Sequence, residues 1–357
     1  HATPWYDEKP NLKKEFGVDL NVIEVSPNEL YSRVFMELQQ KTGAYDLVQY
    51  NSAWVGDFSQ YLMPLDSYIE QDNDAIGFDD ILPAFKDYQC NWGGKRMAIS
   101  VDGDTFLMYY RKDLFTHPEE REAFRAEYGY ELPDPPETWA QVTDLAEFFT
   151  RKKGETLGGS TLTKDFYGYA DQAKRGRAYY WYLFRYIPFS APDPHYFDPD
   201  TMKPLINSDG AVAALENMQE MLAYSPPGVL SWEWDELYNG AMKDGTVAMW
   251  IHWTDEGRGF KNLAPLPTDD PLDPVLGITS TPGVEKNGKV HQFTVIDSAW
   301  VMSIVKDSKY PDKAYQVLKY MFGPNERNLG FIMDARIGWD PYRRSHFESE
   351  KWREEVP

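Results

Sequence analysis

The sequence has only one cysteine, Cys90, among its 357 residues. A lone cysteine cannot form an internal disulfide or a thiolate metal cluster, which excludes the disulfide-stapled and zinc-finger classes of protein. No apolar run reaches the length of a membrane-spanning helix. The six histidines show no HExxH spacing, and the GxSxG, GxGxxG and Walker A motifs do not occur. The sequence therefore lacks the signatures of zinc proteases, α/β-hydrolases and nucleotide-binding enzymes.

Basic residues are also scarce. Lys and Arg number 36 against 57 Asp and Glu, a formal charge of −21, which repels phosphate backbones and argues against a nucleic-acid partner. The acidic stretch 72–80 fails the EF-hand calcium template, because Ile76 replaces an oxygen ligand and Pro83 stands where the closing Glu belongs. We expect no metal and no cofactor.

Aromatic residues are abundant. They make up 15% of the chain, with 12 Trp and 24 Tyr, which is more than two cores need. A chain of this length favours two domains, and exposed aromatic side chains usually mark a binding surface. We therefore expect part of this aromatic surplus to contact a ligand.

Alternating helix and strand patterns predict an α/β protein with sheets covered on both faces. Apolar residues at helical spacing predict helices over 26–43, 136–154, 207–228 and 310–323, the first of them with a capping box from Ser26 to Glu29. Strands are predicted over 45–50, 105–115, 246–251 and 293–304. In such folds ligands bind at the carboxyl ends of the strands, so polar or aromatic residues there are the candidate site.

Several strand ends carry such residues. They are Asn51 with Trp54, Asp102 with Asp104, Trp250 to Thr254, and Asp297 with Ser298. Asp102 and Asp104 have three possible interpretations: a catalytic carboxylate pair, a solvated turn, or acceptors for ligand hydroxyl groups. We favour the hydroxyl-acceptor role for at least one of them. For Asn51, a role in a turn is nearly as well supported as a ligand contact. For Trp54, packing at the start of a helix is as well supported as stacking on a ligand. Trp250 and Trp253 point to opposite sides of their strand, so we expect only Trp253 to reach a ligand.

Five segments in this order resemble the family 1 extracellular solute-binding proteins of ABC sugar importers, the group that contains maltose-binding protein. They are FGVDLNVIEV with ELYSRVFMELQQKTGAYDLVQYNSAWVGDF (16–58), GGKRMAISVDGDTFLMYYRKDLF (93–115), PETWAQVTDLAEFFT (136–150), the stretch 206–253, and DSAWVMSIVKDSKYPDKAYQVLKYMFG (297–323). The resemblance covers nearly the whole chain. Relative to this family, the strand before HATPWYDEKP and several helices after EKWREEVP are missing.

The resemblance implies a two-lobe periplasmic-binding-protein fold of type II, with a ligand cleft between hinged lobes. The N-terminal lobe would comprise 1–107 and 262–305, and the C-terminal lobe 108–261 and 306–357. The implied protein is an exported, periplasmic or extracellular monomer without enzymatic activity. It would capture a neutral carbohydrate or polyol and deliver it to the transmembrane permease subunits of an ABC importer.

The family pattern also implies individual ligand-binding residues. Trp253 matches the stacking platform, and Arg343 matches the arginine of a loop that also contains Trp339 and Asp340. Trp5 is implied in a loop facing the cleft, and Tyr180 or Trp181 at its edge. The alternatives are burial in the core for the aromatic residues and a surface salt bridge for Arg343. The residues predicted to bind ligand are Trp5, Asn51, Trp54, Asp102, Asp104, Tyr180, Trp253, Asp297, Ser298, Trp339 and Arg343.

Two rival functions remain open on the sequence alone. Aromatic residues and carboxylates also suit a glycoside hydrolase, which would consume its ligand and needs two positioned carboxylates. A receptor for a non-sugar ligand such as a glycerol phosphodiester would need several cations at the site, and only Arg343 and Arg177 are candidates.

Overall fold

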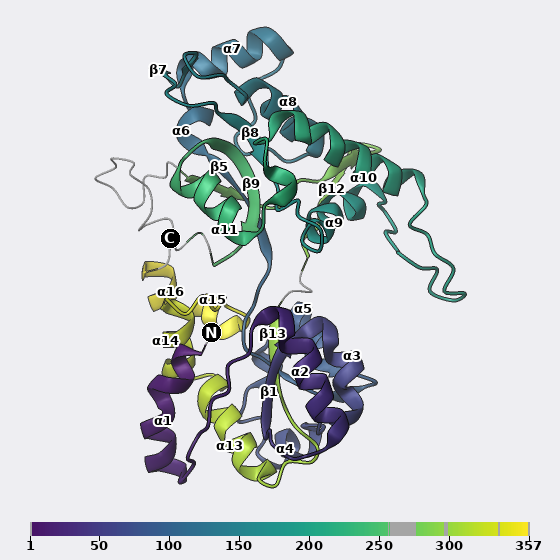
Figure 1. The fold of residues 1–357 in the computed structure, drawn as a ribbon, viewed down its shortest axis with the longest axis vertical. Helices are drawn as coiled ribbons and strands as arrows, with labels where there is room; N and C mark the ends of the chain where they lie inside the picture. The colour runs from purple at the N-terminus through teal and green to yellow at the C-terminus, as the bar shows by residue number, and fades with distance from the viewer. Residues whose placement is uncertain (1, 256, 258–275, 296–298, 335, 356–357) are drawn as a thin grey trace. The chain divides into compact units, whose positions relative to one another are not determined.

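The computed structural model describes residues 2–255, 257, 276–295, 299–334 and 336–355 (Figure 1). The chain forms two units, each with its own hydrophobic core. Unit 1 comprises residues 1–105 and 296–357, and unit 2 comprises residues 106–295. No helix within the described ranges combines the length and the apolar character that crossing a membrane requires.

Unit 1 is built around a three-stranded antiparallel sheet with the order β1-β13-β4. Its strands are β1 (Leu47–Asn51), β13 (Trp300–Ile304) and β4 (Ile99–Ser100), and a short hairpin pairs β2 (Asn91–Trp92) with β3 (Lys95–Arg96). Figure 1 shows α2 and α13 beside this sheet. The helices of unit 1 are α1 (Thr3–Phe16), α2 (Pro27–Gln40), α3 (Val55–Phe58), α4 (Asp66–Gln71), α5 (Pro83–Phe85), α13 (Pro311–Phe322), α14 (Glu326–Met333), α15 (Arg344–Glu348) and α16 (Glu350–Glu355).

Unit 2 is built around a four-stranded sheet with the order β10-β5-β9-β8. Its strands are β10 (Leu276–Thr279), β5 (Phe106–Arg111), β9 (Val247–Trp253) and β8 (Tyr167–Ala170), and only β8 and β9 run parallel. Two hairpins add β6 (Thr156–Leu157) with β7 (Ser160–Thr161) and β11 (Val284–Lys286) with β12 (Lys289–His291). The helices are α6 (Lys112–Phe115), α7 (Pro118–Tyr128), α8 (Trp139–Phe149), α9 (Ala178–Phe189), α10 (Asp209–Glu220) and α11 (Trp234–Leu237).

The helices with clear apolar periodicity form close to their predicted ranges. In α8, Thr138 accepts a hydrogen bond from the backbone of Gln141, whose side chain in turn accepts from the backbone of Thr138, so a capping box starts this helix. The box predicted for α2 does not form: Ser26 makes no side-chain cap, and the Glu29 backbone N–H donates to the Ser26 carbonyl instead. The predicted start of α2 is thus confirmed but its predicted cap is wrong.

The N-terminal segment differs from the prediction, since Trp5 lies in the helix α1 and not in a loop. Trp5 and Leu12 are buried on one side of α1, and Gly17 ends the helix in the left-handed conformation, at φ 65°. Most other positions of α1 are polar, so its apolar stripe is too short to be recognised by periodicity.

The division into units also differs from the predicted one. Residues 276–295, which we had assigned to the N-terminal lobe, belong to unit 2 because β10 pairs with β5. Residues 306–357, assigned to the C-terminal lobe, belong to unit 1, where α13 packs against β13 and α1. The contacts of α13 include a hydrogen bond from Tyr320 to Glu8, which lies 312 residues away in sequence, and no local pattern encodes such a pairing.

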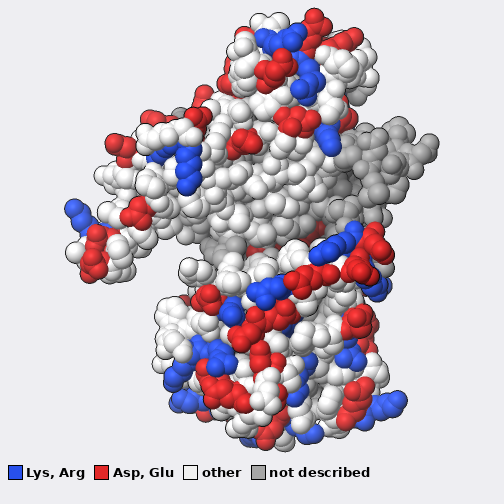
Figure 2. Space-filling model, turned by 180° about the vertical axis from the view of Figure 1, so that it is seen from behind, with Lys and Arg blue, Asp and Glu red and all other residues white. Residues whose placement is uncertain are grey.

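Charged residues are distributed differently over the two units. Figure 2 shows acidic and basic side chains interspersed over unit 1, whereas the face of unit 2 in this view carries fewer charges. No continuous basic patch appears on this face.

Each unit contains a buried histidine whose charged form is disfavoured. Burial lowers the pKa of His252, in unit 2, to about 3, and nearby Arg177 adds to this effect. Burial likewise lowers the pKa of His346, in unit 1, to about 3, with a contribution from Arg343. Both imidazoles are therefore neutral at pH 7, while the same groups in the unfolded chain take up a proton near pH 6.5.

We expect these histidines to destabilise the fold in acid. Because their folded pKa values lie below the unfolded ones, their contribution is fully present above pH 6.5 and is lost as the pH falls toward 3. Each should lower the free energy of unfolding by about 1.4 kcal/mol per pH unit below 6.5. Urea unfolding at pH 7, 6 and 5 measures this slope. His252→Asn and His346→Asn should each reduce the pH dependence of the free energy of unfolding by the contribution of one proton. An unchanged pH dependence in both variants would contradict the assignment.

Candidate functional site

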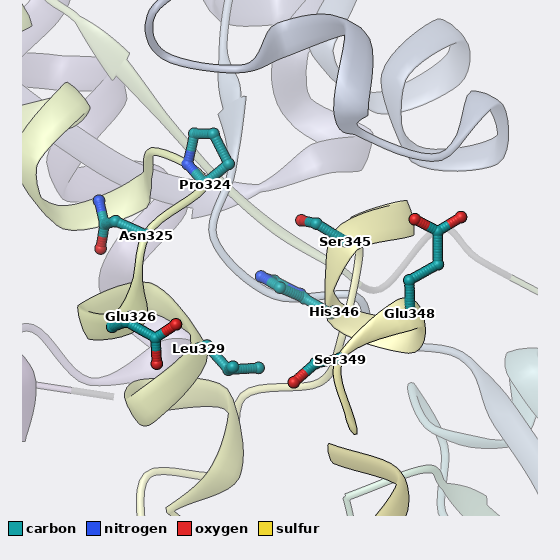
Figure 3. A pocket seen from close by; sticks show the side chains of 8 residues that line it. All are labelled: Pro324, Asn325, Glu326, Leu329, Ser345, His346, Glu348 and Ser349. Atoms are coloured by element: carbon teal, nitrogen blue, oxygen red, sulfur yellow. The ribbon is translucent and has the colours of Figure 1, made fainter. Parts of the chain in front are cut away.

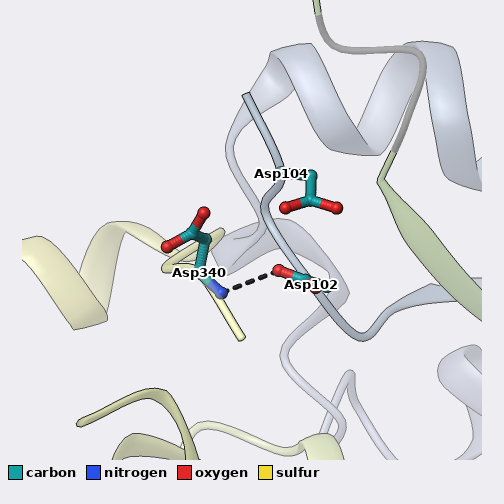
Figure 4. A group of neighbouring side chains, drawn as sticks. All are labelled: Asp102, Asp104 and Asp340. Carbon is teal, nitrogen blue, oxygen red and sulfur yellow. Dashed lines mark hydrogen bonds between the residues drawn. The ribbon is translucent and has the colours of Figure 1, made fainter. Parts of the chain in front are cut away.

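Three carboxylates converge inside unit 1. One carboxylate oxygen each from Asp102, Asp104 and Asp340 lies within 4.8 Å of the other two (Figure 4). All three residues are buried, with exposed fractions of 0%, 8% and 2%. Asp102 and Asp104 follow β4, and Asp340 follows α14, 236 residues further along the chain than Asp104. We call these three residues the carboxylate cluster.

A glycine brings the two segments of the carboxylate cluster together. The backbone N–H of Gly103 donates to the Asp340 carbonyl at 3.0 Å, and Asp102 Oδ1 accepts from the backbone N–H of Asp340 at 2.7 Å. A Cβ atom at position 103 would lie 2.3 Å from the carbonyl oxygen of Pro341. Only glycine allows this approach, so the Asp-Gly-Asp order is a requirement of the packing.

The carboxylate cluster is suited to hydroxyl recognition. Carboxylate oxygens accept charge-assisted hydrogen bonds, which are stronger than those between neutral groups. Hydroxyl groups of a polyhydroxylated ligand are donors that match such a surface. Carboxylates are also ligands of Ca²⁺, and this ion would need further oxygens from backbone or water to reach its roughly six to eight ligands. The acceptor role predicted for Asp102 and Asp104 fits this geometry.

The structure places Arg343 inside the core of unit 1. Its guanidinium is fully buried and donates to the carbonyl oxygens of Gly77, Ile76 and Phe322, with Asp80 at 3.8 Å. These bonds hold the segment after α14 against the loop between α4 and α5. Because this guanidinium donates to three backbone carbonyls, a structural role is favoured for Arg343 over the ligand contact or the surface salt bridge that the sequence suggested.

The predicted tryptophans of unit 1 also lie within its core. Trp339 is fully buried between Phe322 and Phe331, and Trp5 is 6% exposed against Phe322. Trp54 is half-buried and packs on Tyr31 and Phe58. For these three residues the arrangement favours packing over ligand stacking.

The remaining predictions in unit 1 concern Asn51, Asp297 and Ser298. The side chain of Asn51 accepts a hydrogen bond from the backbone N–H of Ala53 at 3.0 Å and caps the turn that follows β1. This is the turn role weighed for Asn51 on the sequence. The predicted residues Asp297 and Ser298 lie outside the described residues.

Unit 2 holds an aromatic cluster at the end of β9. The ring of Trp253 lies 4.7 Å from Phe106, 6.4 Å from Tyr180 and 5.9 Å from Trp181, measured between centroids. The guanidinium of Arg177 lies 5.9 Å from the Trp253 ring. Trp253 is 8% exposed, while Tyr180 and Arg177 are half-buried. The two residues predicted for the ligand in this unit, Tyr180 and Trp253, are thus brought together.

Trp250 belongs to a different environment, as the strand periodicity predicts. It pairs with Tyr109 across β9 and β5, and the two rings stack at 6.1 Å. Trp253 instead faces Phe106. Because successive side chains of a strand point to opposite faces, two tryptophans three residues apart place their indoles on opposite faces of β9.

A buried polar network next to this cluster was missed on the sequence. Arg185 of α9 is fully buried, pairs with Asp171 at 3.0 Å and donates to Asn217 Oδ1 at 2.9 Å. The Gln172 amide donates to His252 Nε2 at 3.2 Å. Asp171 and Gln172 follow the apolar strand β8, so the same strand-end argument that selected Asp102 would have found them.

Two surface hollows lie away from all of these residues. One, of about 330 Å³ in unit 1, is formed where α14 begins and α15 lies, and His346 and Ser345 point into it (Figure 3). The other, of about 640 Å³ in unit 2, lies where α9 ends and α10 begins. Neither is lined by a residue predicted to bind ligand, so the carboxylate and aromatic clusters remain the candidate site.

The comparisons with known proteins bear on this arrangement. Residues 4–327 match the family model described as bacterial extracellular solute-binding protein. The chain belongs to this family. A probable amino-acid ABC transporter periplasmic-binding protein of Sinorhizobium fredii is 22% identical over 241 residues, which cover 66% of this chain and 50% of the relative. The chain thus spans about half the length of that curated relative.

Solved structures support the fold of this solute-binding protein. A ribitol complex of an ABC transporter solute-binding protein from Agrobacterium radiobacter K84 has a TM-score of 0.75 at 20% identity, over 99% of this chain and 80% of that one. Maltose-bound MalE3 of T. maritima has a TM-score of 0.72 at 18% identity, over 99% and 82%. The predicted family and the two-lobe fold class are confirmed.

Proposed function

We propose that this solute-binding protein captures a carbohydrate or polyol for an ABC importer. Each unit holds a group of side chains suited to such a ligand. The carboxylate cluster of unit 1 offers acceptors for hydroxyl groups, and the aromatic cluster of unit 2 offers rings for the apolar C–H face of a sugar. The observation that carries the proposal is the aromatic cluster, in which Trp253 and Tyr180 gather at the end of β9.

The family and the solved relatives point the same way. Two relatives of the same fold were solved with ribitol and with maltose, both of which are polyhydroxylated. In the proposed role the protein works in the periplasm or outside the cell, as a monomer, and its partners are the transmembrane permease subunits. It releases its ligand unchanged.

Ligand-dependent melting and intrinsic tryptophan fluorescence test the proposed function. The panel consists of hexoses, disaccharides, maltodextrins, sugar alcohols and amino acids, with product analysis after incubation. A ligand at a thousandfold excess over its dissociation constant should stabilise the fold by about 4 kcal/mol. Stabilisation by a sugar or polyol without turnover supports the proposal. Turnover, or a response to amino acids alone, would overturn it.

Trp253 should be the main aromatic contact. Trp253→Leu removes the indole, and we expect affinity for the responding sugar to fall about tenfold to a hundredfold, the equivalent of one to two stacking contacts. Trp253→Phe keeps a ring and should lose less. Isothermal titration measures both. Trp250→Phe is the matched control, because Trp250 lies on the opposite face of β9, and an equal loss in this variant would assign the effect to folding.

A further inference from the structure

Arg177 is a cation that lies beside the aromatic cluster. Its guanidinium lies 5.9 Å from the ring centroid of Trp253, within the range of a cation–π contact. The described part of the chain provides this guanidinium with no hydrogen-bond acceptor and no ion pair within 4 Å. Its planar group has five N–H donors, in a geometry that matches two oxygens of one carboxylate or phosphate.

The segment that carries Arg177 is rich in basic residues. Lys174, Arg175 and Arg177 stand within four positions, in a protein whose formal charge is −21. Glu233 lies nearby, but its carboxylate is held by Lys174 at 2.7 Å, and this hydrogen bond lowers the pKa of Glu233. The charge of Arg177 adds to this lowering, but no hydrogen bond or ion pair between Glu233 and Arg177 is found among the described residues.

A second donor lies in the same cluster. Trp181 is fully buried, and its indole Nε1 finds no hydrogen-bond acceptor among the residues that the structure describes. Its ring lies 5.9 Å from that of Trp253. A buried N–H without a partner costs free energy comparable to a lost hydrogen bond, so it points to an acceptor supplied by a ligand. Arg177 and Trp181 thus both lie next to the ring of Trp253.

We propose that Arg177 selects a carbohydrate that carries an anionic substituent, a carboxylate or a phosphate. This inference rests on the proposed function and narrows its substrate class beyond the neutral ligand predicted on the sequence. The anionic group would accept hydrogen bonds from the Arg177 guanidinium, while the sugar ring contacts Trp253.

Matched pairs of ligands test this selection by titration calorimetry. The pairs are galactose with galacturonate, glucose with glucuronate, glucose with glucose 6-phosphate, and the corresponding disaccharides. We expect one acidic member to bind at least tenfold more tightly than its neutral parent, and the carboxylate and phosphate arms identify which oxyanion is preferred. Neutral binding as tight as acidic binding overturns the inference alone. Absence of binding by every sugar overturns both it and the proposed function.

Variants separate Arg177 from the general charge of the segment. Arg177→Met keeps the apolar stem and should lower affinity for the acidic sugar at least tenfold, while affinity for the neutral parent changes less than threefold. Arg177→Lys keeps the charge but not the two-pronged geometry and should recover only part of the preference. Arg175→Met, an exposed neighbour with the same loss of charge, is the matched control. A preference that survives Arg177→Met, or falls equally in Arg175→Met, contradicts the assignment.

Discussion

Replacing Gly103 by alanine is expected to abolish ligand binding and to destabilise unit 1. The added Cβ would lie 2.3 Å from the Pro341 carbonyl oxygen and 2.8 Å from its carbon. These are backbone atoms and cannot rotate away as the end of a side chain can. The segment after α14 must therefore separate from the loop after β4. That movement breaks the hydrogen bonds from Gly103 to Asp340 and from Asp340 to Asp102.

Overpacking and two lost hydrogen bonds should together lower the free energy of unfolding of unit 1 by about 3 kcal/mol or more. Urea unfolding followed by tryptophan fluorescence measures this change, and calorimetry measures the binding. Gly330→Ala, in the helix α14 of the same unit, is the matched control because no atom lies within 4 Å of its added Cβ. It should be neutral or stabilising by up to about 1 kcal/mol. Normal stability and binding in Gly103→Ala would refute the close approach.

Arg185→Met is expected to be the most destabilising change in unit 2. The Arg185 side chain connects three elements, since it pairs with Asp171 after β8, donates to Asn217 on α10 and lies 4.1 Å from the ring of Trp139 on α8. Asp171 is 5% exposed, and burial raises its pKa while the charge of Arg185 opposes that rise. Removal of the arginine leaves a buried carboxylate without its cation.

Breaking a buried pair in this way costs about 3–5 kcal/mol, whereas an exposed pair contributes at most about 1 kcal/mol. Urea unfolding of Arg185→Met measures the loss. The double variant Arg185→Met with Asp171→Asn removes the stranded charge and should recover part of the stability. Lys13→Met breaks the exposed pair with Asp19 and serves as the control. A loss below 1 kcal/mol in Arg185→Met would show that the pair is not a structural support.

The clearest sequence predictions came from periodicity. The apolar stripe of 136–154 marks α8, and the apolar run before Trp253 marks β9. The spacing of Trp250 and Trp253 also predicts opposite faces, which the structure confirms. These features depend on residues within a few positions of one another. In a regular helix or strand, the spacing of two residues decides whether their side chains lie on the same face.

The candidate site was only partly accessible to the same reasoning. Asp102, Asp104, Tyr180 and Trp253 were selected, and each contributes to one of the two clusters. Arg343 matched a family motif, yet its guanidinium binds the carbonyls of Gly77, Ile76 and Phe322. Burial of an arginine depends on which backbone oxygens surround it, and those oxygens lie 21 to 267 residues away in sequence.

The sequence by itself determined the family, the α/β character, and the aromatic and acidic side chains proposed to bind a polyhydroxylated ligand. Tertiary structure alone decided which of them gather. It brought Asp340 to Asp102 across 238 residues, assigned 306–357 to unit 1 through α13, and placed Arg177 beside Trp253. The physical reason is that local patterns report the orientation of a side chain on its own element. Its neighbours are set by long-range packing, in which a single glycine such as Gly103 decides how closely two segments approach.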